Sequence, residues 1–86
     1  MHYTVKLHKD VDKFLISHPD IKKRFLEKAY ILSFDPFASQ LDIKKMQWLR
    51  DTLYRLRIWK YRFVYEVIDD ELVIYFVLAD SRGGVY

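Results

Sequence analysis

The stretch from residue 53 to residue 65, LYRLRIWKYRFVY, constrains the fold of this chain most strongly. Arginine occupies every second position at its start, and apolar side chains fill the positions between: Arg55 and Arg57 alternate with Tyr54, Leu56 and Ile58. Successive side chains of a β-strand point to opposite faces of the sheet, so the pattern predicts a strand with one apolar face and one cationic face. Fixed cations on a rigid sheet suit an anionic ligand.

Hydrophobic spacing predicts the elements that precede this strand. Alternation over residues 3–8 predicts a short half-buried strand. Apolar side chains at helical spacing predict a helix over residues 9–17 and a second helix that starts at Pro19 and stops at the Asp35-Pro36 pair. Residues 37–52 show no clear period, and we expect a loop there with at most one helical turn.

The buried face of the second helix follows from apolar side chains spaced three or four residues apart. The expected stripe consists of Ile21, Phe25, Ala29 and Leu32, widened by Leu26 and Tyr30.

Strands are also expected at about residues 61–68 and 71–79. The order strand, helix, helix, then three strands predicts a single α+β domain over residues 1–86, with an antiparallel sheet and a helical hairpin packed on one face. The chain has no cysteine and no metal-ligand spacing, so we expect no metal and no cofactor, and a cytoplasmic location. The longest apolar run, residues 72–79, is too short to cross a bilayer, and we expect no membrane partner.

The strand register can be predicted if both hairpin turns contain only two residues. Ile58 then faces Tyr61, and Ile68 faces Glu71, and directly opposed residues point to the same side. One face of the sheet becomes wholly apolar, which supports this register and marks the face that the helices should cover. Its members are Tyr54, Leu56, Ile58, Tyr61, Phe63, Tyr65, Ile74, Phe76 and Leu78.

The same register gathers arginine on the other face. It places Arg57, Arg62 and Val77 in one row, with Arg55 in the next. Two opposed arginines repel each other by a few tenths to about 1 kcal/mol, so the arrangement favours a phosphate site that uses both guanidinium groups. The alternative is that these arginines pair with Glu66 or Asp80, or lie in water.

Basic residues are concentrated in one segment, residues 44–62, although the net charge of the chain is only +3. The segment contains seven basic residues and one acid, Asp51, which is the electrostatic pattern of a surface that binds an anionic partner. The alternative for such a run of charge is an ordinary solvated surface. The basic residues are Lys44, Lys45, Arg50, Arg55, Arg57, Lys60 and Arg62.

The chain resembles the RelE/ParE family of bacterial toxins from toxin–antitoxin pairs. The resemblance covers the order of elements along the whole chain, and it is most specific in YRLRIWKYRFVYEV, the apolar strand that follows and the terminal pattern S-R-x-x-V-Y. Members of the RelE branch cleave messenger RNA in the ribosomal A site. The resemblance therefore implies a ribosome-dependent endoribonuclease whose partners are a cognate antitoxin and messenger RNA on the ribosome, with contacts to 16S ribosomal RNA.

The resemblance also implies roles for individual residues. It implies that Arg57, Arg62, Arg82 and Tyr86 are catalytic and that Arg55 binds substrate. Lys44, Lys45 and Lys60 of the basic segment are also predicted to bind substrate, and the alternative for Lys44 and Lys45 is a solvated loop. Metal-free cleavage uses the 2′-OH as nucleophile and needs a proton acceptor, and arginine is a poor base. By position, the candidates for that acceptor are Tyr86, Glu66 and Asp80.

Two other functions fit the same sequence. One is a ParE-like inhibitor of DNA gyrase, although the terminal Val85-Tyr86 pair favours the RelE branch. The other is a catalytically weak toxin that serves as an antitoxin-binding module. That possibility follows from the histidines, because His2, His8 and His18 all lie far from the C-terminal tail in sequence.

Overall fold

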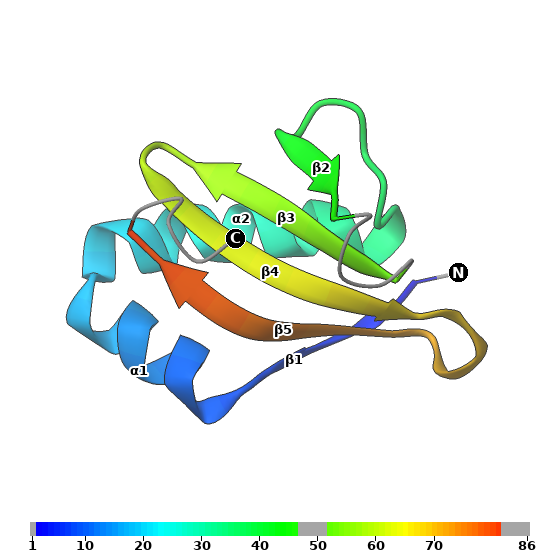
Figure 1. Cartoon of the computed structure of the whole chain (residues 1–86), viewed down its shortest axis with the longest axis horizontal. Coiled ribbons are helices and arrows are strands. Elements are labelled where there is room, and N and C mark those ends of the chain that lie inside the picture. Colours follow the sequence, from blue (N-terminus) through cyan, green and yellow to red (C-terminus); the bar gives the residue numbers. More distant parts are fainter. Residues whose placement is uncertain (1, 47–51, 82–86) are drawn as a thin grey trace.

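The computed structural model describes residues 2–46 and 52–81, which form two helices and a five-stranded sheet (Figure 1). The expected α+β fold is confirmed. The sheet has the strand order β1-β5-β4-β3-β2, and α1 and α2 pack on one side of it. The elements are β1 Thr4–Leu7, α1 Lys9–Ser17, α2 Pro19–Phe34, β2 Ile43–Lys45, β3 Leu53–Ile58, β4 Tyr61–Ile68, the 3₁₀ turn Asp69–Glu71 and β5 Val73–Asp80.

The sheet is mixed, because β1 runs parallel to β5 while the other neighbouring pairs are antiparallel. The expectation of an antiparallel sheet is therefore wrong for the β1–β5 pair. β2 was also missed, since residues 37–52 were expected to be a loop. This strand has only three residues, too few for a period to show, and it pairs with β3 at the edge of the sheet.

Both helices lie where their spacing predicted them. Pro19 is the first residue of α2, and Asp35, the residue before Pro36, ends it. The stripe Ile21, Phe25, Ala29 and Leu32 is buried. The widening of the stripe was wrong, because Leu26 is 53% exposed and Tyr30 is 68% exposed. α2 meets the sheet along a narrow stripe, and nothing in the described part of the chain covers the flank that carries these two side chains.

The main core lies between the helices and the sheet. Phe25 from α2 contacts Phe63 and Phe76 through ring pairs with centroids 4.9 and 4.8 Å apart. Tyr65 is fully buried, and its hydroxyl donates a hydrogen bond of 2.8 Å to the carbonyl of Pro36. Burial of each such aromatic side chain stabilises the fold by roughly 1.5–3 kcal/mol. This aromatic core holds the sheet rigid beneath its open side.

The first hairpin has the predicted register. Ile58 pairs with Tyr61 across the two-residue turn Trp59-Lys60, so Arg57 lies directly opposite Arg62. Trp59 takes a left-handed backbone with φ of 59°, which a two-residue hairpin requires of at least one turn residue.

The second hairpin differs from the prediction. Ile68 pairs with Val73 rather than Glu71, because residues 69–71 form a 3₁₀ turn and Leu72 has φ of 54°. The chain turned there without glycine, and the sequence pattern carried no sign of the longer connection.

A bulge in β5 then shifts the register again. Tyr65 pairs with Phe76, but the preceding residue, Val64, pairs with Leu78, so Val77 is the extra residue. The bulge reverses the alternation beyond it. Leu78, predicted on the helix-covered side, packs on the open side, and Asp80 replaces Val77 as the residue paired with Arg62.

Candidate functional site

The open side of the sheet carries the predicted arginines in a defined arrangement. Arg57, Arg62 and Asp80 form one row across β3, β4 and β5, and Arg55 and Val64 belong to the next row. We call this surface, with Arg55, Arg57, Arg62 and Asp80, the arginine face. It looks away from the helices, and α2 passes behind the sheet in Figure 1.

The two opposed arginines differ in exposure. The Arg57 side chain is exposed, and Arg62 is half-buried. Arg62 has Arg57 on one side and the carboxylate-bearing residue Asp80 on the other. Asp80 was one of the two acids considered as pairing partners, and the bulge brings it into the arginine row. The row therefore combines two cations with one anion, so a net positive charge remains for a ligand.

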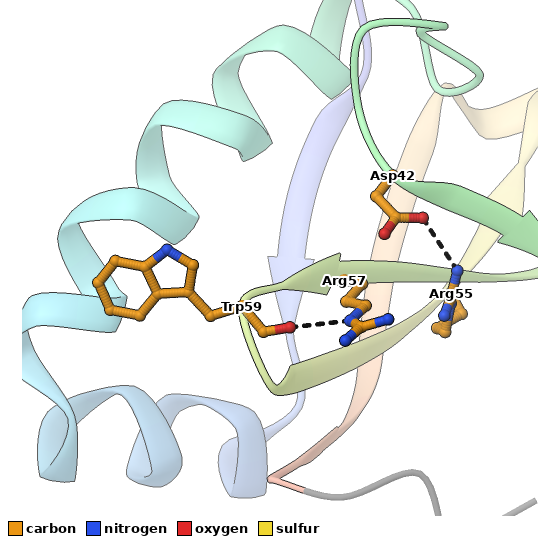
Figure 2. A network of polar contacts seen from close by, with 4 residues as sticks. All are labelled: Asp42, Arg55, Arg57 and Trp59. Carbon is orange, nitrogen blue, oxygen red and sulfur yellow. Dashed lines mark hydrogen bonds and ion pairs between the residues drawn. The ribbon is translucent and has the colours of Figure 1, made fainter.

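A backbone carbonyl fixes the orientation of Arg57. Its Nε–H donates a hydrogen bond of 2.8 Å to the carbonyl oxygen of Trp59 (Figure 2). With Nε engaged, the terminal Nη atoms are the part of this guanidinium that can meet an anion. Two N–H groups from one end of a guanidinium match two oxygens of a phosphate.

Arg55 is held more tightly than Arg57. Its Nη2 donates to the Asp42 carboxylate at 3.1 Å, and the Arg55 side chain is only 13% exposed (Figure 2). Its Nε is buried without a hydrogen-bond partner among the described residues. The backbone carbonyl of Asp42 also accepts a hydrogen bond of 2.9 Å from the backbone N–H of Arg57. Asp42, the residue before β2, therefore contacts two residues of the arginine face.

An apolar floor lies on the same open side. Met46, Leu53 and Val64 are buried there, and Val77 and Leu78 pack against them. This apolar floor lies on the same side of the sheet as the arginines, where it lowers the local dielectric and strengthens charge interactions. Leu78 joins it because the bulge turns this residue to the open side, which Val77 would face under regular alternation as well.

The structure separates the three predicted lysines. Lys44 pairs with Arg55 and belongs to the open side, whereas Lys45 pairs with Tyr54 and belongs to the other side. Lys60 lies in the hairpin turn, with its Nζ 5.5 Å from the centroid of the Tyr61 ring. The geometry thus brings Lys44 to the arginine face and leaves Lys45 away from it. The predicted catalytic residues Arg82 and Tyr86 lie outside the described residues.

The three histidines lie away from the arginine face. His2 stacks on Phe34, His8 accepts a hydrogen bond from the Asp10 backbone at the start of α1, and His18 stacks on Phe14. Among residues 2–46 and 52–81, no group of three or more metal-binding side chains occurs. None of the helices described is long and apolar enough to span a membrane.

The two carboxylates considered as proton acceptors have different surroundings. Asp80 is the register partner of Arg62, while Glu66 accepts a hydrogen bond of 3.2 Å from the Thr52 hydroxyl and has Leu53 and Tyr75 as register partners. Asp80 is therefore the described carboxylate in the arginine row. Glu66 lies two rows along β4 from Arg57 and Arg62 by register.

A groove on the helix-covered side is a further surface, and sequence reasoning missed it. It has a volume of about 570 Å³ and lies between β1 and α2, with Val5 and Leu7 on one wall and Leu26, Tyr30 and Phe34 on the other. The last three recur every four residues along α2, so they follow one another on one flank. That spacing is the signal that the sequence offers, but the prediction assigns Leu26 and Tyr30 to the buried stripe and does not include Phe34.

Comparison with known proteins gives close relatives. A protein of Methanocaldococcus jannaschii described as "Putative toxin RelE1" is 34% identical over 88 aligned residues, which cover 100% of this chain and 97% of the relative. The crystal structure of an archaeal RelE–RelB complex from Pyrococcus horikoshii OT3 matches with a TM-score of 0.83 and 37% identity, covering 99% of this chain and 100% of that chain.

A second solved structure shows the same fold at lower identity. The toxin–antitoxin complex RelBE2 of Mycobacterium tuberculosis matches with a TM-score of 0.78 and 23% identity, over 95% of this chain and 100% of that chain. No family model matches the chain.

Proposed function

The chain belongs to the RelE family of toxins, and from that premise we propose that it is the toxin of a toxin–antitoxin pair that cleaves messenger RNA in the ribosomal A site. The toxin assignment rests on full-length similarity to relatives of that description. The cleavage activity is our inference from the resemblance to the RelE branch, and the arginine face supports it.

One observation carries the proposed activity, namely the placement of Arg57 directly opposite Arg62 on the open side of the sheet. Two opposed cations cost a few tenths to about 1 kcal/mol relative to a neutral pair. An anion between them removes that cost. In the transition state of cleavage, the phosphodiester gains negative charge that both guanidinium groups can stabilise. Phosphate is thus the ligand that this pair fits best.

The chemistry needs no metal. The 2′-OH of the RNA attacks the adjacent phosphorus, the bond from phosphorus to the 5′-oxygen breaks, and the products are a 2′,3′-cyclic phosphate and a 5′-OH. A base takes the 2′-OH proton, and an acid returns a proton to the 5′-oxygen. Arg57 and Arg62 stabilise the charge on the pentavalent phosphorane. Tyr86, Glu66 and Asp80 remain the candidates for the proton acceptor, and Asp80 is the one that shares a row with Arg62.

The test is codon-specific cleavage of messenger RNA on programmed ribosomes, read by primer extension. Arg57→Ala and Arg62→Ala should each remove most of the activity. The double variant should lose much less than the sum of both losses, because both residues act on the same charge. Lys22→Ala, which removes an exposed cation from α2, is the matched control and should cleave like the wild type.

Thermal melts of the same variants control for folding. Each arginine variant should remain folded, since loss of one cation relieves the cross-strand repulsion. Full cleavage by Arg62→Ala would overturn the site assignment. Intact messenger RNA together with accumulating breaks in gyrase-bound DNA would replace the proposed activity by gyrase inhibition.

A catalytically weak toxin remains the second candidate, and the histidine positions favour it. All three histidines lie on other parts of the molecule, so none supplies a base to the arginine face. In that case the wild type would leave messenger RNA uncut on ribosomes and still bind its antitoxin.

The groove between β1 and α2 is the surface that we propose for the antitoxin. The matched relative from Pyrococcus horikoshii was crystallised as a RelE–RelB complex, which supports an antitoxin as the partner here. β1 is an edge strand whose residues Thr4 and His8 donate backbone N–H groups to the carbonyls of Leu72 and Phe76. The alternate residues Val5 and Leu7 therefore direct theirs to the free edge. An extended antitoxin segment could pair with that edge and fill the groove with apolar side chains.

A further inference from the structure

Two contacts, through three residues, connect the helix-covered side of the sheet with Arg57. The guanidinium carbon of Arg24, on α2, lies 4.2 Å from the centroid of the Trp59 ring. Trp59 in turn accepts the Nε–H of Arg57 on its carbonyl oxygen at 2.8 Å. Figure 2 shows the Trp59 side chain directed toward the helices and its carbonyl directed toward Arg57.

The backbone of Trp59 makes this arrangement unusual. A φ of 59° is unfavourable for a residue as bulky as tryptophan, and glycine or asparagine is the ordinary choice at such a turn position. A tryptophan held there calls for compensating contacts. The cation–π contact with Arg24 supplies one, because a guanidinium over an indole face is attracted by the ring quadrupole.

The direction of the Trp59 carbonyl depends on this backbone conformation. If the turn relaxed, the carbonyl would rotate and Arg57 would lose its acceptor. The free guanidinium of an exposed arginine samples many rotamers, and its repulsion from Arg62 would drive it away from the shared row. A held indole therefore keeps the Nε–H of Arg57 on the Trp59 carbonyl, and this limits the positions that the Nη atoms of Arg57 can take.

We propose that Arg24 is a positioning residue for Arg57 and acts through Trp59, so that a cation on the helix side of the sheet sets the geometry of the phosphate site on the open side. This inference rests on the proposed function of Arg57. It adds two residues that neither touch the phosphate nor share its face. It also explains why a tryptophan occupies a turn that suits glycine.

Three variants separate this role from a general effect on folding. Arg24→Ala removes the cation, and Trp59→Gly removes the ring while keeping a residue that accepts a positive φ. Lys23→Ala is the matched control, because Lys23 is the exposed neighbour on α2 and lines the same hollow beside Trp59. Arg24→Ala and Trp59→Gly should each lower the rate of messenger RNA cleavage on programmed ribosomes about two- to five-fold, and Lys23→Ala should not.

The decisive measurement repeats Arg24→Ala in an Arg57→Lys background. Lysine carries no Nε–H at the position that meets the Trp59 carbonyl, so the loss from Arg24→Ala should disappear there. Loss of stability alone would lower activity equally in both backgrounds, and that result would overturn the proposal.

A second readout does not depend on cleavage. The NMR signal of the Arg57 Nε–H can be assigned by its absence in Arg57→Lys. Its chemical shift should move toward that of a free arginine in Arg24→Ala and in Trp59→Gly, but not in Lys23→Ala. An unchanged signal in Arg24→Ala would overturn the proposal. If the signal moves as expected but the wild type cuts no RNA, the positioning role stands and the nuclease activity is rejected.

Discussion

Tyr65 shows at the scale of one residue how a polar atom is accommodated in the core. The side chain is fully buried between Tyr54 and Phe76, and its hydroxyl donates to the carbonyl of Pro36 at 2.8 Å. The hydrogen bond joins β4 to the segment that follows α2. Burial, together with the nearby Tyr54 and Asp35, raises the pKa of the Tyr65 hydroxyl well above its ordinary value of 10.

Tyr65→Phe should therefore destabilise the fold, because the carbonyl of Pro36 loses its buried partner. We expect the free energy of unfolding to fall by about 1–3 kcal/mol, with a decrease in Tm of about 4–8 °C for each kcal/mol. Thermal melts measure the change, and Tyr30→Phe, at an exposed tyrosine, is the matched control. Equal Tm values for both variants would contradict the role assigned to the hydroxyl.

The raised pKa of Tyr65 also predicts how the stability of the wild type depends on pH, and Tyr65→Phe lacks this dependence. The folded state favours neutral Tyr65, so its contribution to stability is complete below pH 10 and is lost as the pH rises through the raised folded pKa. Urea unfolding between pH 8 and 11 should show the wild type losing stability above pH 10 faster than Tyr65→Phe does.

At the scale of the elements, the bulge in β5 determines which residues reach the arginine face. Val77 is the one residue of β5 without a register partner between Phe76 and Leu78. Regular alternation from Phe76 would turn Leu78 and Asp80 toward the helices, as it does in the predicted register. The additional residue turns them to the open side, where Leu78 joins the apolar floor and Asp80 takes the register position opposite Arg62.

Deletion of Val77 is the corresponding test. Phe76, Leu78, Ala79 and Asp80 would then alternate regularly and keep the partners that they have now, so the chain should fold with a straight β5. We expect a cooperative melt with a reduced Tm, since Val77 also packs against the apolar floor. Deletion of Ile74, a fully buried residue in the regular part of β5, is the control and should abolish the cooperative melt. Loss of folding on deletion of Val77 would show that the bulge itself is required.

At the scale of the whole molecule, the two proposed surfaces lie on opposite sides of one sheet. The arginine face occupies the open side of β3, β4 and β5, while the groove lies between β1 and α2 on the helix-covered side. An antitoxin segment in the groove would leave Arg57 and Arg62 uncovered. Binding to the antitoxin and cleavage of RNA should therefore be separable by mutation.

Tyr30→Asp and Leu26→Asp test that separation. Both side chains are exposed in the free protein, so the variants should fold, but a carboxylate in an apolar interface is strongly unfavourable. We expect messenger RNA cleavage at the wild-type rate and a loss of the co-purified antitoxin complex on size-exclusion chromatography. Ile16→Asp, at an equally exposed apolar residue of α1, is the matched control and should keep the complex. A stable complex with either groove variant would exclude the groove as the docking site.

The sequence by itself determined the elements whose signal is local. Helix α1, the Pro19 start and Asp35 end of α2, and the tight turn that places Arg57 opposite Arg62 were all predicted, because spacing and proline geometry act over a few residues. The arginine pair, the basis of the proposed site, thus came from alternation together with a two-residue turn.

Only the tertiary structure decided the features that depend on distant partners. The parallel pairing of β1 with β5, the strand at Ile43–Lys45 and the bulge at Val77 each arise from contacts between segments far apart in the chain. So do the Asp80 partner of Arg62 and the contact of Arg24 with Trp59. A side-chain period of two residues records which faces are apolar, but a single additional residue reverses the faces without disturbing the pattern on either side.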